Sequence, residues 1–173
     1  NDRLGAKDAT GYLIALGHRR IGFIGGPDNC RASRERELGH IDALAEYGLD
    51  LGAELADSGD GSFEAGHQAG LLMLCVSPRP SAIFASTDAM AAGVLVAAHE
   101  QGIAVPDALS VVGFGDSAIA RTTWPSLTTM RMQAAEMAFT AAIKLVDPEN
   151  AAAQPQEFFC ELVIRGSTAP PAG

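Results

Sequence analysis

Continuous apolar runs alternate along most of the chain with segments whose apolar residues recur every three or four positions. The continuous runs, such as Ile21–Ile24, are typical of strands buried on both faces of a parallel sheet, and the spaced pattern is typical of amphipathic helices. The predicted strands are 21–27, 54–57, 82–85, 109–114, 125–131 and 157–164, and the predicted helices are 4–16, 33–47, 63–76, 89–101 and 133–145. Because helices and strands alternate with short connections, the pattern predicts a doubly wound parallel α/β sheet.

Residues near the ends of these segments give more local expectations. We expect Ser33 to cap the second helix, with Ile41 and Ala45 in its buried stripe. We expect His18 to lie in a solvated turn with Arg19 and Arg20, which is a commoner role for such residues than a binding patch. The remaining segments are predicted to be irregular at 117–124, a loop at 151–156 and a tail from residue 165.

Composition narrows the class of protein. The chain has 173 residues, 47% of them hydrophobic, which suits one domain, or one and a part, with a buried core. The net charge of −9 argues against direct binding of a phosphate backbone by these residues. No apolar run of about 18 residues exists and the start lacks a signal peptide's apolar core, so we expect a cytoplasmic location and no membrane contact. The three distant cysteines, Cys30, Cys75 and Cys160, are expected to be reduced thiols.

No set of residues for catalysis or metal binding can be recognised. The chain lacks a phosphate-binding loop of the Gly-x-x-x-x-Gly-Lys type and a Gly-x-Ser-x-Gly nucleophile turn. The four histidines, at 18, 40, 67 and 99, do not have metal-ligand spacing and are expected on the surface or in packing. We therefore expect no enzyme activity, no metal and no cofactor.

Polar residues gather instead at the ends of three predicted parallel strands, in the loops 26–36, 86–88 and 115–117. Such ends share one edge of a sheet, where α/β proteins bind ligands. Arg36 is favoured as a binding residue, because a positive charge early in a helix opposes the helix dipole and needs another reason to be there. Asp88 is favoured as part of a helix start that follows Thr87. Asp116 follows glycines that let a ligand approach the backbone.

Several stretches together resemble the lactose/galactose-repressor family of bacterial transcription regulators. They are LGHRRIGFIGGP at 16–27, STDAMAAG at 86–93, VPD at 105–107, SVVGFGD at 110–116, LTT at 127–129 and LVIRGST at 162–168. These motifs occur in the family's order over nearly the whole chain.

The resemblance implies a periplasmic-binding-protein-like effector domain, in which a sugar or related metabolite binds between two lobes. Residues 1–127 would form the C-terminal lobe, 128–161 a hinge strand, helix and strand returning to the N-terminal lobe, and 162–173 the final segment and tail. The DNA-binding helix-turn-helix headpiece and most of the first lobe would lie outside these residues. The implied partners are a small-molecule effector, operator DNA through that headpiece, and a second copy in a homodimer.

The family's effector contacts carry over to some positions here. Arg36 matches an effector-binding arginine, and Thr87 stands where an asparagine often touches the ligand. The acid that contacts effector falls on Gly115, so Asp116 is the second acid of that run. Because the carboxylate beside Arg36 is lost, we hypothesise a more positive pocket and a sugar acid such as gluconate as effector. The further candidate contacts are Cys30, Ala32 and Gly61, the last standing where an aromatic residue often packs on the effector.

Two other functions remain open on the sequence alone. A solute-binding protein of a sugar transporter would use the same fold outside the cytoplasm. An enzyme on a doubly wound sheet is the weakest alternative, because no nucleophile, base and orienting residue converge. The helix at 133–145 gives a separate expectation: without a first lobe, Met137, Phe139, Ile143 and Leu145 should be exposed and should promote association.

Overall fold

The computed structural model describes residues 1–50, 52–146 and 157–172. The predicted loop at 151–156 therefore lies outside the described residues. The helices are α1 (Asp2–Ala15), α2 (Arg31–Glu46), α3 (Phe63–Leu74), α4 (Asp88–Glu100), α5 (Ala118–Thr122) and α6 (Ala134–Val146), with a short 3-10 turn η1 (Ala53–Leu55). The strands are β1 (Ile21–Gly25), β2 (Ala56–Ser58), β3 (Ala82–Ala85), β4 (Ser110–Gly115), β5 (Thr128–Arg131) and β6 (Glu161–Val163).

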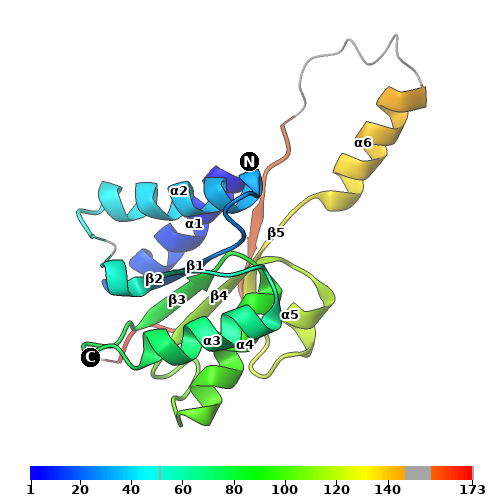
Figure 1. Cartoon of the computed structure of the whole chain (residues 1–173). Helices are drawn as coiled ribbons and strands as arrows, with labels where there is room; N and C mark the ends of the chain where they lie inside the picture. The colour runs from blue at the N-terminus through cyan, green and yellow to red at the C-terminus, as the bar shows by residue number, and fades with distance from the viewer. Residues whose placement is uncertain (51, 147–156, 173) are drawn as a thin grey trace.

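The strands form one sheet in the order β2-β1-β3-β4-β5-β6. Every neighbouring pair is parallel except β5 and β6, which are antiparallel. Helices α1 and α2 cover one face and α3 and α4 the other (Figure 1). The predicted doubly wound α/β class is therefore confirmed. The winding direction reverses between β1 and β3, which makes their adjacent ends the switch point of the sheet.

The two faces of the sheet have separate cores, because side chains alternate along each strand. Ile21 and Phe23 of β1 pack under α1 and α2, whereas Ile24 packs under α3 and α4. Phe84 and Ile83 of β3 divide in the same way. The central strands are therefore buried on both sides, as their continuous apolar runs predict.

Helix α2 differs from its prediction. It begins at Arg31, after Cys30 in an extended conformation, so the prediction that Ser33 caps it is wrong. Its buried face is formed by Gly39, His40, Ala43 and Leu44, while Ile41 and Ala45 are exposed. The reason is close packing on α1: a Cβ atom at Gly39 would lie 2.1 Å from the carbonyl oxygen of Arg3.

Two histidines are built into the interior. The prediction that His18 lies in a solvated turn is wrong: it is 1% exposed and contacts the hydroxyls of Ser81 and Ser110 and the Ala169 carbonyl. Arg19 does cap the end of α1, by donating to the Ile14 carbonyl. His40 stacks on Phe23, and burial lowers the pKa of His40 to about 3, so its ring is neutral.

The segment after β4 and the end of the chain are both more ordered than expected. Residues 117–124 contain α5, so the prediction of an irregular segment is wrong; buried Ala120 anchors this helix and accepts a hydrogen bond from the Leu127 amide. β6 is shorter than the predicted strand 157–164, because β5, its partner, ends at Arg131. The expected tail is packed: Ser167 is fully buried and its hydroxyl donates to the Val111 carbonyl.

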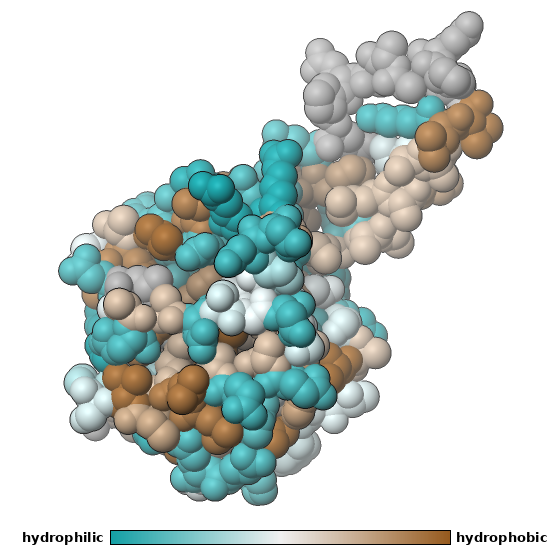
Figure 2. All heavy atoms as spheres, in the orientation of Figure 1, coloured by the Kyte–Doolittle hydropathy of each residue, from teal (hydrophilic) through white to brown (hydrophobic). Residues whose placement is uncertain are grey.

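Helix α6 projects away from the body of the molecule, and apolar atoms cover much of its visible side (Figures 1 and 2). None of its residues is buried. Phe139 is 68% exposed and Leu145 is 84% exposed, and Met137 and Ile143 are also exposed, as expected. None of the described helices has the length and apolar character needed to cross a membrane.

We expect the isolated chain to associate through α6, because an exposed apolar face gains free energy when another surface covers it. Sedimentation should give a mass well above the 17.9 kDa of one chain. Replacing both Phe139 and Leu145 by Glu should restore the monomer. The matched control is Leu72→Glu on α3, whose side chain is 68% exposed. A monomeric, folded unmodified chain would contradict this expectation.

Candidate functional site

The candidate site lies at the carboxyl ends of β1 and β3, at the switch point of the sheet. After β1 the backbone passes close to α2 at Gly26, where a Cβ atom would lie 2.4 Å from the Ser33 hydroxyl. After β3, Ser86 and Thr87 lead directly into α4. The two strand ends and the start of α2 thus meet at one place, as predicted from the order of the strands.

Arg36 brings these elements together. Its Nη1 atom donates to the Ser86 carbonyl at 2.7 Å, and its guanidinium lies 4.0 Å from the ring centre of Phe114 on β4. Its Nε and Nη2 atoms both contact Oδ1 of Asp2, the first residue of α1, at 2.7 and 2.6 Å. Nη2 also contacts the Met132 sulfur just after β5. The side chain is only 11% exposed and is anchored on four elements.

The contact with Asp2 changes the charge argument made from the sequence. We expected that Gly115 in place of an acid would leave Arg36 without a carboxylate and the pocket more positive. The structure supplies a different carboxylate from α1, so that premise is wrong. No local pattern predicts this pairing, since Asp2 and Arg36 lie 34 positions apart on two different helices.

Thr87 and Gly61 lie together on the other side of the switch point. The Thr87 hydroxyl accepts a hydrogen bond from the Met90 amide and so caps α4, as expected, and it donates to the Gly61 carbonyl. Gly61 has φ +90°, a conformation that favours glycine, and adopts it in the loop before α3. The pair joins the ends of β2 and β3.

Cys30 and Ala32 lie at the start of α2. Cys30 is exposed, and hydrogen bonds from the backbone and side chain of Ser33 and then from the Ala32 backbone lower the pKa of its thiol. Ala32 lines a hollow of about 440 Å³ between the starts of α1 and α2. The other lining residues are Asn1, Asp2, Arg3, Arg31 and Glu35.

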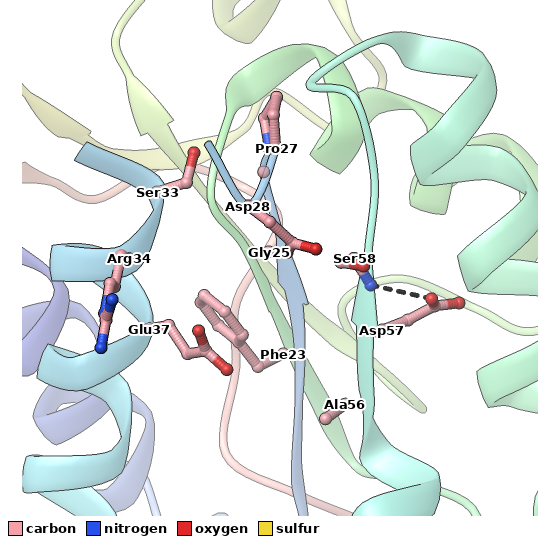
Figure 3. Close-up of a pocket in the computed structure, with 11 residues that line it drawn as sticks. Phe23, Gly25, Pro27, Asp28, Ser33, Arg34, Glu37, Ala56, Asp57 and Ser58 are labelled. Carbon is pink, nitrogen blue, oxygen red and sulfur yellow. Dashed lines mark hydrogen bonds between the residues drawn. The ribbon is translucent and has the colours of Figure 1, made fainter. Parts of the chain in front are cut away.

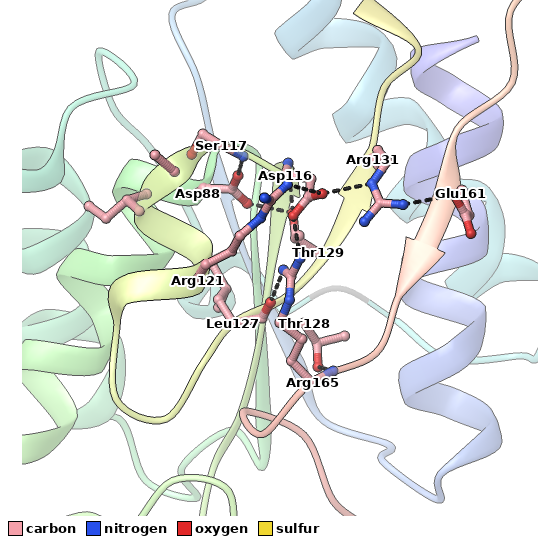
Figure 4. Close-up of polar contacts among 12 residues, drawn as sticks. Asp88, Asp116, Ser117, Arg121, Leu127, Thr128, Thr129, Arg131, Glu161 and Arg165 are labelled. Atoms are coloured by element: carbon pink, nitrogen blue, oxygen red, sulfur yellow. Dashed lines mark hydrogen bonds and ion pairs between the residues drawn. The ribbon is translucent and has the colours of Figure 1, made fainter.

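Asp116 lies apart from this group, in a cluster of ion pairs (Figure 4). Its carboxylate is 2% exposed and contacts Arg131 at the end of β5, Arg165 near the chain end and Arg121 of α5. Burial alone would raise the pKa of Asp116, but hydrogen bonds from Arg131 and Arg165 outweigh it and lower the pKa. Asp116 has φ 52°, which turns the chain sharply after β4. Its contacts hold together the strand end, α5 and the last residues.

Asp88 is the first residue of α4, in the helix start predicted for it, and its carboxylate also holds neighbouring segments together. Its carboxylate accepts hydrogen bonds from the Ser117 amide at 2.6 Å and from the Thr129 hydroxyl (Figure 4). It therefore ties α4 to the residues after β4 and to the first half of β5. Among the described residues, no three His, Cys, Asp or Glu side chains are grouped so that they could hold a metal ion.

A second hollow opens beside β1 and β2 and is lined partly by the predicted loop 26–36 (Figure 3). It measures about 580 Å³, and Phe23 and the backbone of Gly25 and Gly26 form part of its wall. Its polar lining comes from Asp28, Ser33, Arg34, Glu37, Asp57 and Ser58. None of the six residues predicted to bind effector lines it.

Comparison with known proteins identifies the family. Residues 10–168 match the periplasmic binding protein-like domain. This chain belongs to that family. The HTH-type transcriptional repressor CytR of Escherichia coli K12 is 36% identical over 166 residues, which are 94% of this chain and 49% of CytR. The HTH-type transcriptional regulator GalS of Salmonella typhimurium is 39% identical over 134 residues, 78% of this chain and 39% of GalS. The chain thus spans about half the length of the curated relatives it matches, or less.

Solved structures of periplasmic-binding-protein-like regulators have the same fold. A sugar-binding transcriptional regulator of the LacI family from Escherichia coli, complexed with phosphate, matches 99% of this chain with a TM-score of 0.91 at 33% identity, over 62% of its own chain. A dimeric Lac repressor matches 99% of this chain with a TM-score of 0.91 at 28% identity, over 63% of its own chain. The resemblance to the lactose/galactose-repressor family is confirmed.

The Asp116 cluster predicts a measurable loss of stability. Asp116→Asn should lower the free energy of unfolding by about 2 kcal/mol near neutral pH, because Arg165 loses its buried counter-charge and Arg131 keeps only its exposed contact with Glu161. The pKa of Asp116 is lowered in the folded state, so its stabilisation is complete above about pH 4 and is lost as pH falls through the lowered pKa. The difference between the two proteins in urea denaturation should therefore shrink at low pH. Asp107→Asn, in an exposed loop, is the control, and an equal loss there would contradict the prediction.

Proposed function

We propose that this chain is the sugar-sensing part of a DNA-binding transcriptional repressor that acts in the cytoplasm. The observation that carries the proposal is Arg36, which reaches from α2 to the switch point of the sheet and contacts residues on α1 and directly after β3 and β5. An arginine and a carboxylate held side by side suit a ligand rich in hydroxyls, because together they offer hydrogen-bond donors and acceptors. The proposed contacts are Arg36, Thr87, Cys30, Ala32 and Gly61.

The relatives support a regulator over the other two interpretations. Those named above are transcription regulators, and one neighbour is described as sugar-binding. A further neighbour, 29% identical with a TM-score of 0.85, is the regulator CelR in complex with cellobiose. No catalytic activity, metal or cofactor forms part of the proposal. In it, residues 1–127 belong to the C-terminal lobe, 128–161 pass to and from the N-terminal lobe, and 162–173 close the C-terminal lobe.

In the proposed mechanism, effector binding between two lobes changes the affinity of a helix-turn-helix headpiece for operator DNA. A ligand shifts such an equilibrium only if it binds one arrangement of the lobes more tightly than the other. Within the proposed 128–161 segment β5 still pairs with β4, so the chain leaves the sheet after Arg131 and rejoins it at β6. Arg131 contacts both Asp116 and Glu161 at this crossing. Asp116 in this scheme positions the crossing segments for the effector site. The active form is proposed to be a homodimer, as one neighbour's description as a dimeric repressor suggests.

The proposal predicts that the full-length protein is stabilised by a small hydroxyl-rich ligand. A thermal-shift screen of sugars, sugar acids and nucleosides should give at least one compound that raises the melting temperature by several degrees, since a ligand at 100 times its Kd adds about 2.7 kcal/mol to stability. Arg36→Ala should weaken binding of that compound at least about tenfold by removing charged hydrogen bonds. Arg79→Ala, in an exposed loop, should not. A hit unaffected by Arg36→Ala would refute the site, and the lack of any hit would refute the sensor.

A further inference from the structure

We propose that Asp2 is a specificity-determining residue of the effector site, and that it selects neutral sugars over sugar acids. The inference rests on the proposed function and defines its ligand class. It reverses the expectation drawn from the sequence, because the carboxylate beside Arg36 is present after all and comes from another helix.

The geometry shows how firmly Asp2 engages Arg36. Two guanidinium nitrogens, Nε and Nη2, contact the same carboxylate oxygen, Oδ1. The Asp2 side chain is 29% exposed and that of Arg36 is 11% exposed, so the pair is shielded from water on most sides. A shielded pair of this kind is screened less by salt than a surface ion pair.

The third nitrogen of Arg36 is also engaged. Nη1 donates to the Ser86 carbonyl, and the face of the guanidinium rests on the Phe114 ring. An incoming carboxylate could form the usual two-pronged contact with Arg36 only by displacing Asp2. Displacement would leave a carboxylate without its counter-charge next to the ligand's own negative charge, which is unfavourable in a partly buried site.

A hydroxyl group meets no such obstacle. It can donate to the Asp2 carboxylate and accept from an N–H of Arg36 at once, since a hydroxyl has one donor and two acceptor sites. Asp2 also lines the 440 Å³ hollow, which is of a size suited to a small ligand, whereas Arg36 is not one of its lining residues. The charged lining of the hollow is balanced, with Asp2 and Glu35 against Arg31 and Arg3, and Arg3 is itself paired with Asp42.

The position of Asp2 beside Arg36, where its negative charge would repel an anionic ligand, is fixed by helix α1. Asp2 occupies the first turn of α1, where the helix dipole favours a negative charge. Helix α1 in turn packs against α2 at Gly39, three residues beyond Arg36. The spacing of the two helices therefore fixes the carboxylate beside the guanidinium.

The test compares matched neutral and acidic ligands by calorimetry on the full-length protein. The probes are D-glucose with D-glucuronate, D-galactose with D-galacturonate, and cellobiose with cellobionate. The unmodified protein should bind the neutral member of its preferred pair at least tenfold more tightly. Asp2→Asn, which keeps the shape and removes the charge, should reduce that preference at least tenfold. Asp2→Ser provides a second variant that suits a helix start.

The matched control is Asp42→Asn, which removes an aspartate that also forms an ion pair between α1 and α2, with Arg3, away from Arg36. It should leave the preference unchanged. Tighter binding of the acid by the unmodified protein, or a preference unaltered in both Asp2 variants, would overturn the inference and leave the sensor intact. Binding of no member of any pair would overturn the inference, and the lack of any hit in the wider thermal-shift screen as well would overturn the proposed function.

Discussion

Helices cover both faces of the central strands, so polar side chains can be placed only at the strand ends without a cost in free energy. β1 and β3 are completely buried along their length. The polar residues that this constraint excludes from the sheet interior gather at the two edges formed by the amino and carboxyl ends of the parallel strands. One edge carries the buried His18 with its serine partners, and the opposite edge carries Arg36, Thr87, Asp88 and Asp116.

The reversal of winding between β1 and β3 decides which part of that edge can bind a ligand. Helices α2 and α4, which follow β1 and β3, cover opposite faces of the sheet (Figure 1), and α/β proteins bind ligands in the space outside such a point. Arg36 fills part of that space from α2, and α1 approaches near enough to supply Asp2, because Gly39 has no side chain. Asp116 and Asp88 are used for a different purpose next to it, since their carboxylates are taken up by arginines, an amide and a hydroxyl (Figure 4). Asp88 and Asp116 thus stabilise the packing of the strands and helices that surround Arg36 and Asp2.

The sequence predicts the parts of this arrangement that depend on local pattern. Apolar runs identify the strands, and the order of elements brings the loops after β1, β3 and β4 to one edge. Long-range polar pairing leaves no such pattern. Nothing near His18 in the sequence reveals that Ser110 and Ala169 will enclose it.

The sequence mispredicts the charge of the site for the same reason. The residues at the end of β4 show that Gly115 stands where the family has an acid. The carboxylate that contacts Arg36 comes instead from Asp2, at the start of α1. The apolar pattern mispredicts the buried face of α2, because close contact at Gly39, rather than the hydrophobicity of Ile41, decides how that helix is rotated.

The central claim is that ligands bind at the switch point, against Arg36 and Asp2. The most direct measurement is a crystal structure of the full-length protein with the sugar that stabilises it most. The account predicts a ligand hydroxyl within hydrogen-bond distance of both the Arg36 guanidinium and the Asp2 carboxylate. A ligand seated instead in the hollow beside β2, against Asp57 and Ser58 and out of reach of Arg36, would contradict it (Figure 3).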